Sequence, residues 1–437
     1  MKKIYILLSF CVFLVGSEVK FEGNLPELIL AAQSSNLAQI SNYEPQKAQL
    51  QKDAVKSAYM PNLTIDGGYS FLSGDINVLR PQRAATARAI LELAVYDGGK
   101  REALLSSLSH LSAAEILKNE EYQNLLAFNA TKLYFSFLSL GELALAKDGE
   151  INYLKNALNR LEKYYRAGLS DESEYEAVNA RYAMALAERL EISQNQNEIK
   201  NQIYALTGRD IEPVAGSRIA FADDFAPQKS EKPELEALKL NFAAALEDEK
   251  ITASETNPQI FIKNTYTFMR THYDRNLLPA QYRSALEPYF DDFFKPNLNT
   301  NELILGFSWK AFDFGAIKKQ REIKRISALQ AKLNLDQKRL QNELNLANIK
   351  NDLKTLEQKI AAGESALNSA QTSLNAVSKK YEAGLLGYVE FLNATAQSFS
   401  AGSALELSKS KFEIKKAEYL YERGGKIAEN IEKTERK

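Results

Sequence analysis

Few residues in this chain of 437 residues have the types and spacing that catalytic chemistry requires. The chain has two histidines, His110 and His272, and one cysteine, Cys11. Neither histidine belongs to a metal-ligand spacing, and the sequence contains no Gly-rich phosphate loop and no nucleophile elbow. Carboxylates are plentiful, but on long helices they usually form a solvated face. We therefore expect no enzyme, no cofactor and no metal site, with His110 on a helix surface and His272 in an external loop.

Composition limits the class of protein further. The 55 basic and 56 acidic residues nearly balance, whereas dedicated nucleic-acid binders carry a basic excess. Apolar residues make up 45% of the chain, which is not typical of disorder. We expect a folded protein with no nucleic-acid partner.

Residues 1–17 have the pattern of a secretory signal peptide. Two lysines precede an apolar run at 4–15, and small residues follow up to Ser17. We expect cleavage after Ser17, and a buried strand is the alternative. Cys11 raises the question of acylation, but Phe10 before it fits a lipoprotein signal poorly. Beyond this segment no apolar stretch is long enough for a membrane-spanning helix, so only strands could cross a membrane.

The rest of the chain is a tandem repeat. Tyr-Asp-Gly-Gly at 96–99 recurs as Phe-Asp-Phe-Gly at 312–315, and Tyr-x-Ala-Gly-Leu at 165–169 recurs at 381–385, with the same offset. Residues 61–65 match 258–262 at a smaller offset, so the second copy holds extra residues, which we expect within 270–299. The predicted domains are a signal peptide (1–17), a first repeat (18–208), a connector (209–232), a second repeat (233–424) and a C-terminal tail (425–437).

Four segments alternate between apolar and polar residues, which predicts strands over 63–71, 87–95, 260–268 and 303–309. Each has about the ten residues that a tilted strand needs to cross a bilayer. Asn264 interrupts one apolar face, and aromatic residues lie near the strand ends: Tyr69, Phe71, Tyr266, Phe268 and Trp309. A soluble sheet fits the alternation equally well, but the signal peptide and the repeat favour a membrane. Four strands cannot enclose a pore without open edges, so the membrane interpretation requires several chains.

Helical spacing begins after Gly99 and after Gly315. Apolar residues step by three and four from Leu346 to Tyr381, and the matching seam of the first copy runs from Ala130 to Tyr165. This period predicts left-handed coiled-coil packing. A helix from 99 to 167 would be about 100 Å long, enough to extend across a compartment. Gly168 and Gly384 are expected to end the long helices, and shorter helices return over 171–206 and 387–423.

The order, spacing and duplication of these features resemble the TolC-like outer-membrane efflux family over nearly the whole mature chain. The features are Tyr-Met-Pro-Asn-Leu at 59–63, Val-Tyr-Asp-Gly-Gly at 95–99 and the two Tyr-x-Ala-Gly-Leu turns. The resemblance implies a membrane α+β fold. In it, a homotrimer pools four strands per protomer into a 12-stranded β-barrel in outer-membrane lipid, continued by a periplasmic α-helical coiled-coil tunnel. It also implies a periplasmic adaptor protein and an inner-membrane transporter as partners.

The resemblance places the site residues near the two helical turns. It implies contact with the adaptor at the helical tips: Ala167, Gly168, Leu169, Ala383, Gly384 and Leu385. It also implies an acidic constriction of the tunnel just after the second turn. There Glu390 keeps a carboxylate and Asn393 does not, and Glu174 is the equivalent of Glu390 in the first copy. Three copies of Glu390 would attract cations, and a solvated helix surface is the alternative.

Some members of this family hold the tip closed with a tyrosine and an arginine. Tyr381 matches the tyrosine, but Leu386 stands at the position of the arginine. We therefore expect gate packing by Tyr381 and Leu386 without that lock, or plain seam packing of Tyr381.

Three functions remain open from the sequence. The first is the exit duct of a tripartite efflux system for small molecules. The second is the duct of a type I protein secretion or metal efflux system. The third is a periplasmic coiled-coil scaffold without a pore, which predicts extraction without detergent.

Overall fold

The computed structural model describes residues 21–74, 78–168, 171–220 and 231–433. The predicted signal peptide, its Cys11 and the tip residue Leu169 lie outside these ranges. The described residues form two compact units. The first unit contains residues up to 43, 118–235 and 338 onward, and the second contains 44–117 and 236–337.

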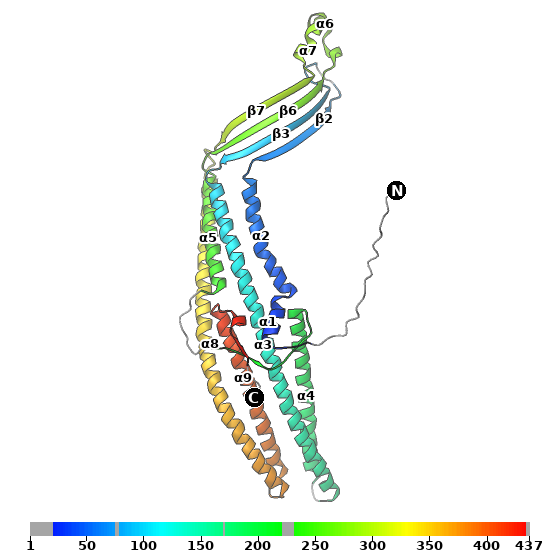
Figure 1. Cartoon of the computed structure of the whole chain (residues 1–437), viewed down its shortest axis with the longest axis vertical. Coiled ribbons are helices and arrows are strands. Elements are labelled where there is room, and N and C mark those ends of the chain that lie inside the picture. The colour runs from blue at the N-terminus through cyan, green and yellow to red at the C-terminus, as the bar shows by residue number, and fades with distance from the viewer. Residues whose placement is uncertain (1–20, 75–77, 169–170, 221–230, 434–437) are drawn as a thin grey trace, which may run out of the picture. The chain divides into compact units, whose positions relative to one another are not determined.

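The second unit contains a four-stranded antiparallel sheet in the order β2-β3-β6-β7 (Figure 1). Its strands are β2 (Asn62–Phe71), β3 (Arg83–Tyr96), β6 (Gln259–His272) and β7 (Asn297–Ser308). All four predicted strands are confirmed. The prediction of His272 as a loop residue was wrong, because this residue pairs with Arg83 at the end of the β3–β6 ladder. The predicted strand ended at residue 268, where the apolar alternation stops, but the backbone hydrogen bonds of β6 continue to His272.

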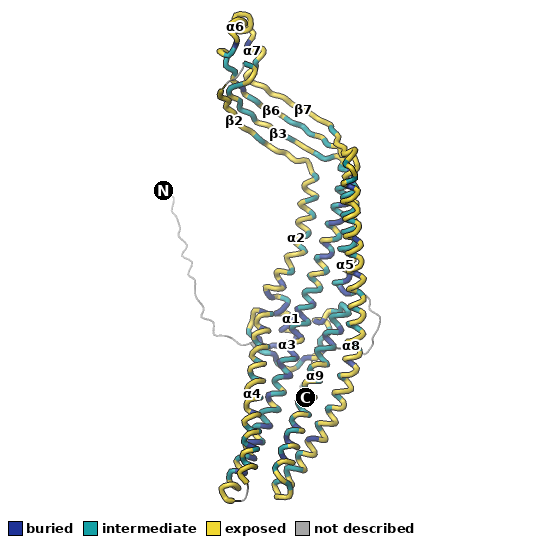
Figure 2. Tube along the Cα trace, turned by 180° about the vertical axis from the view of Figure 1, so that it is seen from behind, coloured by how far each residue is buried: buried dark blue, intermediate teal, exposed yellow. Residues whose placement is uncertain are grey.

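Both faces of this sheet are open to solvent in a single chain (Figure 2). Apolar side chains on one face remain exposed, with Ile65 at 76%, Leu305 at 75% and Phe307 at 76%. The opposite face carries charges, including Arg88 Nε, which donates to Asp66 Oδ1 at 2.8 Å. Strands β2 and β7 are the two edges of the sheet. Exposed apolar area on this scale marks a contact surface for lipid or for other chains.

In the second unit, α5 (Pro233–Ser254) and the first parts of two longer helices lie side by side near the sheet. Helix α5 lies between α3 (Lys100–Arg166) and α8 (Ala316–Glu382). Ser107 Oγ on α3 donates to Asp248 Oδ1 on α5 at 3.0 Å, and Arg321 Nε on α8 donates to Glu249 Oε1 at 3.0 Å. Helix α2 (Asn36–Ala58) contacts α3 through Lys52 Nζ and the Ser109 hydroxyl at 3.1 Å.

The start of α8 is fixed by Asp313. Its carboxylate accepts hydrogen bonds from the backbone N–H of Ile317 at 2.6 Å and of Gly315 at 2.9 Å. These donors would otherwise be unpaired at a helix N-terminus. The hydrogen bond from Ile317 is the main reason why the pKa of Asp313 is lowered. The change from strand spacing to helical spacing after Gly315 in the sequence is therefore explained by the Asp313 cap at the start of α8.

The matching turn before α3 depends on two glycines in the left-handed region, Gly98 at φ +79° and Gly99 at φ +91°. The Gly98 carbonyl accepts from Asn257 Nδ2 at 2.8 Å. A Cβ on Gly98 would lie 2.5 Å from the Ser254 carbonyl oxygen, whereas one on Gly99 would meet nothing within 4 Å. Glycine is thus required at position 98 because the backbone of Ser254 lies too close for a side chain, in addition to the φ angle. At position 99 glycine is required only by the φ angle.

We expect Gly98→Ala to destabilise the protein by about 2–4 kcal/mol, combining left-handed strain with a steric clash. Gly99→Ala is the matched control, because it adds the same methyl group at a similar φ without the clash, and should cost about 1–2 kcal/mol. Thermal unfolding followed by circular dichroism of the two variants measures the difference. Equal losses would mean that the close approach at Gly98 contributes nothing.

The extra residues of the second copy form a folded loop between β6 and β7. It contains α6 (Ala280–Leu286) and α7 (Phe290–Phe293), which lie beyond one end of the sheet (Figure 1). Phe290 is buried, its ring lies 4.7 Å from that of Phe294, and the Arg275 guanidinium lies 5.2 Å from the Phe290 ring. Arg275 also pairs with Asp291 at 2.6 Å. The aromatic residues of this loop therefore build a small core of their own.

The first unit is built on two helical hairpins, α3 with α4 (Glu172–Thr207) and α8 with α9 (Tyr388–Glu422). Helices α3 and α8 have 67 residues each, and their first residues, Lys100 and Ala316, keep the offset of the repeat. The predicted long and returning helices are thus confirmed. Helix α1 (Leu25–Gln33), started by a capping box between Asn24 and Glu27, buries its apolar side against these hairpins (Figure 2).

Two small sheets join the connector and the tail to this unit. Strand β1 (Phe21–Gly23) pairs with β4 (Ile211–Pro213), and β5 (Ser217–Ile219) pairs with β8 (Ile431–Lys433). Helix α9 fixes β5 through one residue, Ile219. The Glu413 carboxylate accepts from the Ile219 N–H at 2.8 Å, and Lys416 Nζ donates to the Ile219 carbonyl at 2.9 Å. The described part of the predicted C-terminal tail, up to Lys433, is therefore part of the folded unit.

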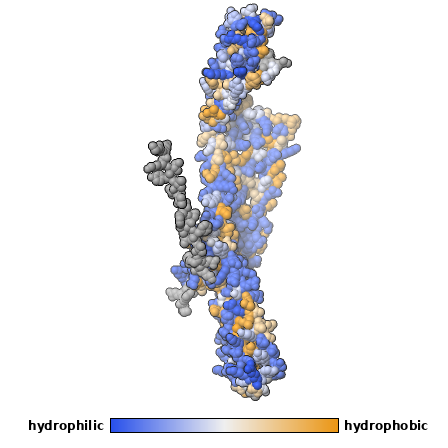
Figure 3. Space-filling view, turned by 90° about the vertical axis from the view of Figure 1, so that its right-hand side faces the viewer, coloured by the Kyte–Doolittle hydropathy of each residue, from blue (hydrophilic) through white to orange (hydrophobic). Residues whose placement is uncertain are grey.

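Among the described helices, none is both long enough and apolar enough to cross a membrane. On the face drawn in Figure 3, hydrophilic residues predominate and hydrophobic ones occur in small groups.

Candidate functional site

The predicted site residues lie where the two helical hairpins turn. Gly168 after α3 has φ +69°, and Gly384 after α8 has φ +71°. Glycine tolerates this conformation, which ends a helix. After α8, the Leu385 N–H donates to the Lys380 carbonyl at 2.9 Å and closes the turn. Both predicted helix ends are therefore confirmed.

The described tip residues are all exposed: Ala167, Gly168, Ala383, Gly384 and Leu385. Leu385 is 73% exposed, so the second turn presents an apolar side chain to its surroundings. A small, partly apolar tip of this kind suits contact with another protein.

The predicted constriction residues have two different environments. Glu390 and Asn393 are both exposed and lie one turn apart near the start of α9. The N-terminus of a helix favours the negative charge of Glu390. Glu174, in the first turn of α4, is half-buried and close enough to Tyr381 that, after burial itself, its charge helps to raise the pKa of that phenol. The structure therefore associates Glu174 with the predicted gate residue Tyr381, and leaves Glu390 on an open helix face.

Tyr381 belongs to a stack of three aromatic rings that joins the two hairpins. Phe391 on α9 is 4% exposed and lies between two tyrosines. Its ring centroid is 5.0 Å from that of Tyr153 on α3 and 4.7 Å from that of Tyr381 on α8, with interplanar angles of 20° and 18°. Sequence reasoning missed Phe391 and Tyr153. Leu386, the other predicted gate residue, is half-buried just after the turn.

A cavity of about 160 Å³ adjoins this stack. Tyr153, Tyr381 and Phe391 line it together with Arg160 of the first hairpin and Glu382 of the second. Arg160 and Glu382 form an ion pair at 3.8 Å, but both side chains are more than 40% exposed. Exposed pairs of this length contribute about 0–1 kcal/mol. The ring stack around the buried Phe391, and not this ion pair, therefore holds the hairpins together at this level.

A buried charge network joins the two helices of the first hairpin. Glu150 on α3 has 1% of its side chain exposed and accepts from Lys147 Nζ and from Arg181 of α4, both at 2.6 Å. Lys147 also bonds Glu188 of α4. Burial opposes the charged form of Lys147, but its two carboxylate partners outweigh burial and raise its pKa. Lys147 occupies an apolar seam position of the predicted coiled coil, and this was the sequence signal for the network.

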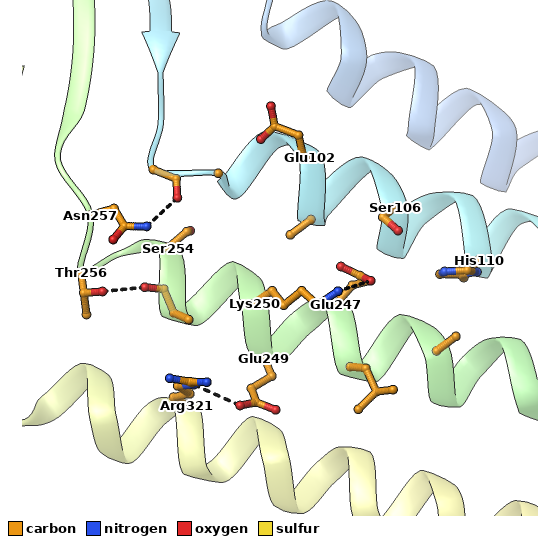
Figure 4. A pocket seen from close by; sticks show the side chains of 16 residues that line it. Glu102, Ser106, His110, Glu247, Glu249, Lys250, Ser254, Thr256, Asn257 and Arg321 are labelled. Atoms are coloured by element: carbon orange, nitrogen blue, oxygen red, sulfur yellow. Dashed lines mark hydrogen bonds and ion pairs between the residues drawn. The ribbon is translucent and has the colours of Figure 1, made fainter.

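The second unit contains an open groove of about 990 Å³ between α3, α5 and α8 (Figure 4). Four of its charged side chains are paired, with Lys250 Nζ 2.8 Å from Glu247 Oε1 and Arg321 bonded to Glu249. Ser106 and His110 lie one turn apart on α3, yet within the described ranges no hydrogen bond joins them. Of the residues that the structure places, no three of His, Cys, Asp or Glu could hold a metal ion.

Comparison with known proteins agrees with these features. The family model described as "Outer membrane efflux protein" matches residues 228–417. The chain is 21% identical over 419 residues to the outer membrane protein TolC of Escherichia coli (strain K12), covering 92% of this chain and 83% of that protein. The family model therefore matches the second half of the chain, and the curated relative extends the similarity to nearly all of it.

Solved structures share the fold. The outer membrane protein VceC of Vibrio cholerae has a TM-score of 0.77 at 17% identity, covering 92% of this chain and 96% of VceC. The CmeC outer membrane channel of Campylobacter jejuni has a TM-score of 0.76 at 12% identity, covering 93% and 86%. Fold, family match and sequence relatives together indicate an outer membrane efflux protein of the TolC type. The predicted family and the predicted outer-membrane localisation are confirmed.

Proposed function

We propose that this chain is one protomer of a homotrimeric channel that forms the exit duct of a tripartite efflux system. In this proposal small molecules pass from an inner-membrane transporter and a periplasmic adaptor, through the helical part in the periplasm, to the exterior. The observation that carries the proposal is the four-stranded sheet, whose apolar face is exposed and whose edges β2 and β7 are open. In lipid each unpaired edge group costs several kcal/mol, so the edges must pair with other copies.

The trimer would place twelve strands in a closed barrel, which removes every open edge. The tandem repeat is supported by the equal lengths and matching positions of α3 and α8. The exposed tip residues, among them Gly168 and Leu385, are the proposed contact with the adaptor. The turns at Gly168 and Gly384 are alike, so adaptor hairpins could meet both.

Glu390 is the proposed charged constriction. By three-fold symmetry its exposed carboxylate would form a ring of three charges, which attracts cations. Asn393 and Glu174 are the other residues proposed at this constriction. Tyr381 is the proposed gate residue, acting through the ring stack with Phe391.

Single-channel conductance of detergent-extracted protein in a planar bilayer tests the function and the constriction together. We expect a small, cation-preferring pore, and we expect Glu390→Ala to lower the ratio of cation to anion permeability by about two- to five-fold, because three charges are lost at once. Asn393→Ala is the matched control, since it shortens an exposed neighbouring side chain without changing charge.

A pore whose selectivity survives Glu390→Ala would reject the constriction and keep the channel. A water-soluble protein without a pore would reject the channel in favour of the periplasmic scaffold. The partner transporter, identified by cross-linking in the native membrane, separates small-molecule efflux from type I protein secretion and metal efflux.

A further inference from the structure

The apolar face of the sheet changes its chemistry along the strands. Near the helices, the row formed by the strand register is mostly aliphatic, with Leu63, Leu91 and Leu303, and only Asn264 interrupts it. Toward the α6–α7 loop the paired positions become aromatic, amide and cationic. In register order these further rows are Ile65, Ala89, Tyr266 and Asn301; Gly67, Ala87, Phe268 and Asn299; Tyr69, Ala85, Arg270 and Asn297; and Phe71, Arg83 and His272.

The two arginines of this face lie over aromatic rings. The Arg83 guanidinium is 5.8 Å from the Phe71 ring centroid, and the Arg270 guanidinium is 5.9 Å from the Phe268 centroid. Both arginines are exposed, and neither forms an ion pair with a carboxylate in the part of the chain that the structure places. Arg88, on the opposite face, is neutralised by Asp66 at 2.8 Å. Two guanidinium groups without a described carboxylate partner therefore lie on the face that the proposed function turns toward lipid.

The asparagines of β7 on this face lie at two different levels along the strand. Asn301 lies toward the aliphatic rows, and its Oδ1 accepts from Asn264 Nδ2 at 2.8 Å, so these two amides satisfy each other. Asn297 and Asn299 are exposed and lie nearer the loop. From Phe307 to Asn297 the strand rises about 34 Å, or about 26 Å along the normal at a usual tilt. Because outer-membrane barrels have an apolar band about 25 Å tall, Asn297 reaches the outer lipid interface and Asn299 lies one row below it.

We propose that Phe71, Arg83, Phe268, Arg270, Asn297 and Asn299 form a binding patch for the phosphorylated saccharide head group of an outer-leaflet glycolipid. The proposal rests on the proposed function, which turns this face toward lipid. Guanidinium groups bind phosphate through paired hydrogen bonds, and asparagine amides donate to and accept from sugar hydroxyls. Aromatic rings alone would form an ordinary interfacial girdle. Two arginines and a row of amides beside those rings match the charge and the hydroxyls of a glycolipid.

Native mass spectrometry of the detergent-extracted protein, titrated with rough lipopolysaccharide, tests the patch. We expect Arg83→Gln with Arg270→Gln to weaken binding by about ten-fold or more, because each lost contact is a charge-assisted hydrogen bond. Lys263→Gln is the matched control, since it removes one cation from the opposite face of the same sheet. Asn297→Leu with Asn299→Leu should also weaken binding of lipopolysaccharide, and should leave binding of phosphatidylglycerol unchanged.

Several outcomes would overturn the patch. If the double arginine variant weakens phosphatidylglycerol as much as lipopolysaccharide, the surface recognises any lipid phosphate and not a glycolipid. If Lys263→Gln has the same effect, net charge and not this face is responsible. Conductance recorded on the same samples keeps the two proposals apart. A conducting pore with unchanged lipid binding rejects the patch alone, whereas absence of a pore rejects the channel.

Discussion

Replacing Phe391 by alanine is expected to raise the conductance of the resting channel several-fold. Phe391 is 4% exposed between Tyr153 of the first hairpin and Tyr381 of the second. Its removal enlarges a cavity that is already about 160 Å³. Phenylalanine-to-alanine changes in cores cost about 3–5 kcal/mol. The lost contacts join the two hairpins to each other. We therefore expect the lost stabilisation to let the tips of the two hairpins separate, which would widen the channel.

Two further variants identify the ring stack as the cause. Phe391→Leu keeps an apolar side chain but removes the stacking, so it should raise conductance less than alanine does. Arg160→Gln breaks the other contact between the hairpins, the exposed ion pair with Glu382 at 3.8 Å, and should change conductance little. Single-channel recordings and thermal unfolding should be measured on all three variants. A Phe391→Ala protein that unfolds earlier but conducts like wild type would make the stack structural only.

The sequence predicts this site only in part, for a physical reason. Periodicity identifies what one helix buries, and it therefore marked Tyr381 as a seam residue. It does not show that Tyr381 stacks on Phe391, or that Phe391 also stacks on Tyr153, which lies far away in the chain, in the other repeat. Phe391 has no sequence signal of its own, because a single apolar residue near the start of a helix is typical of ordinary packing. Lys147 shows the opposite case, since a lysine in an apolar seam has to be paired, and the buried Glu150 is its partner.

The strands were easier to predict than the segment between them. Alternation over 63–71 reproduces β2 within one residue, whereas β3 begins at Arg83, before its predicted start at residue 87. A register shift between Ala94 and Tyr96 interrupts the alternation of β3 at its other end. The loop at 270–299 gave no periodicity, because its helices are short. Its order comes from tertiary contacts such as Arg275 with Phe290, which a local pattern does not contain.

Replacing Lys232 by methionine is expected to destabilise the first unit by about 3–5 kcal/mol, the usual cost of removing one partner of a buried ion pair. Lys232 has 5% of its side chain exposed and lies 3.3 Å from Glu121, 3.2 Å from Glu422 and 3.5 Å from Glu234. Its ammonium is also 4.3 Å from the ring centroid of Tyr421. One lysine therefore contacts three carboxylates where the connector meets α3 and α9, and of these Glu234 also pairs with Lys338. Methionine would fill the volume of Lys232 without its charge.

The pH dependence of this variant separates charge from packing. Burial already raises the pKa of Glu121 in the wild type, against the opposing effect of Lys232. Without the ammonium this pKa rises further, so the folded variant binds a proton more tightly than the unfolded chain does. Its stability then increases as the pH falls from neutral toward and through the folded pKa of Glu121. Wild type, which keeps the compensating cation, should change less over the same range.

Thermal midpoints at pH 7 and pH 5, followed by circular dichroism, check this prediction. Lys338→Met is the matched control, because Lys338 pairs with Glu234 at 3.1 Å but is 50% exposed, and its loss should cost about 0–1 kcal/mol. Adding Glu121→Gln to the Lys232→Met protein should restore part of the lost stability and remove the pH dependence. If acidification and Glu121→Gln both leave the variant unchanged, the lysine stabilises this region through the packing of its methylene chain and not through its charge.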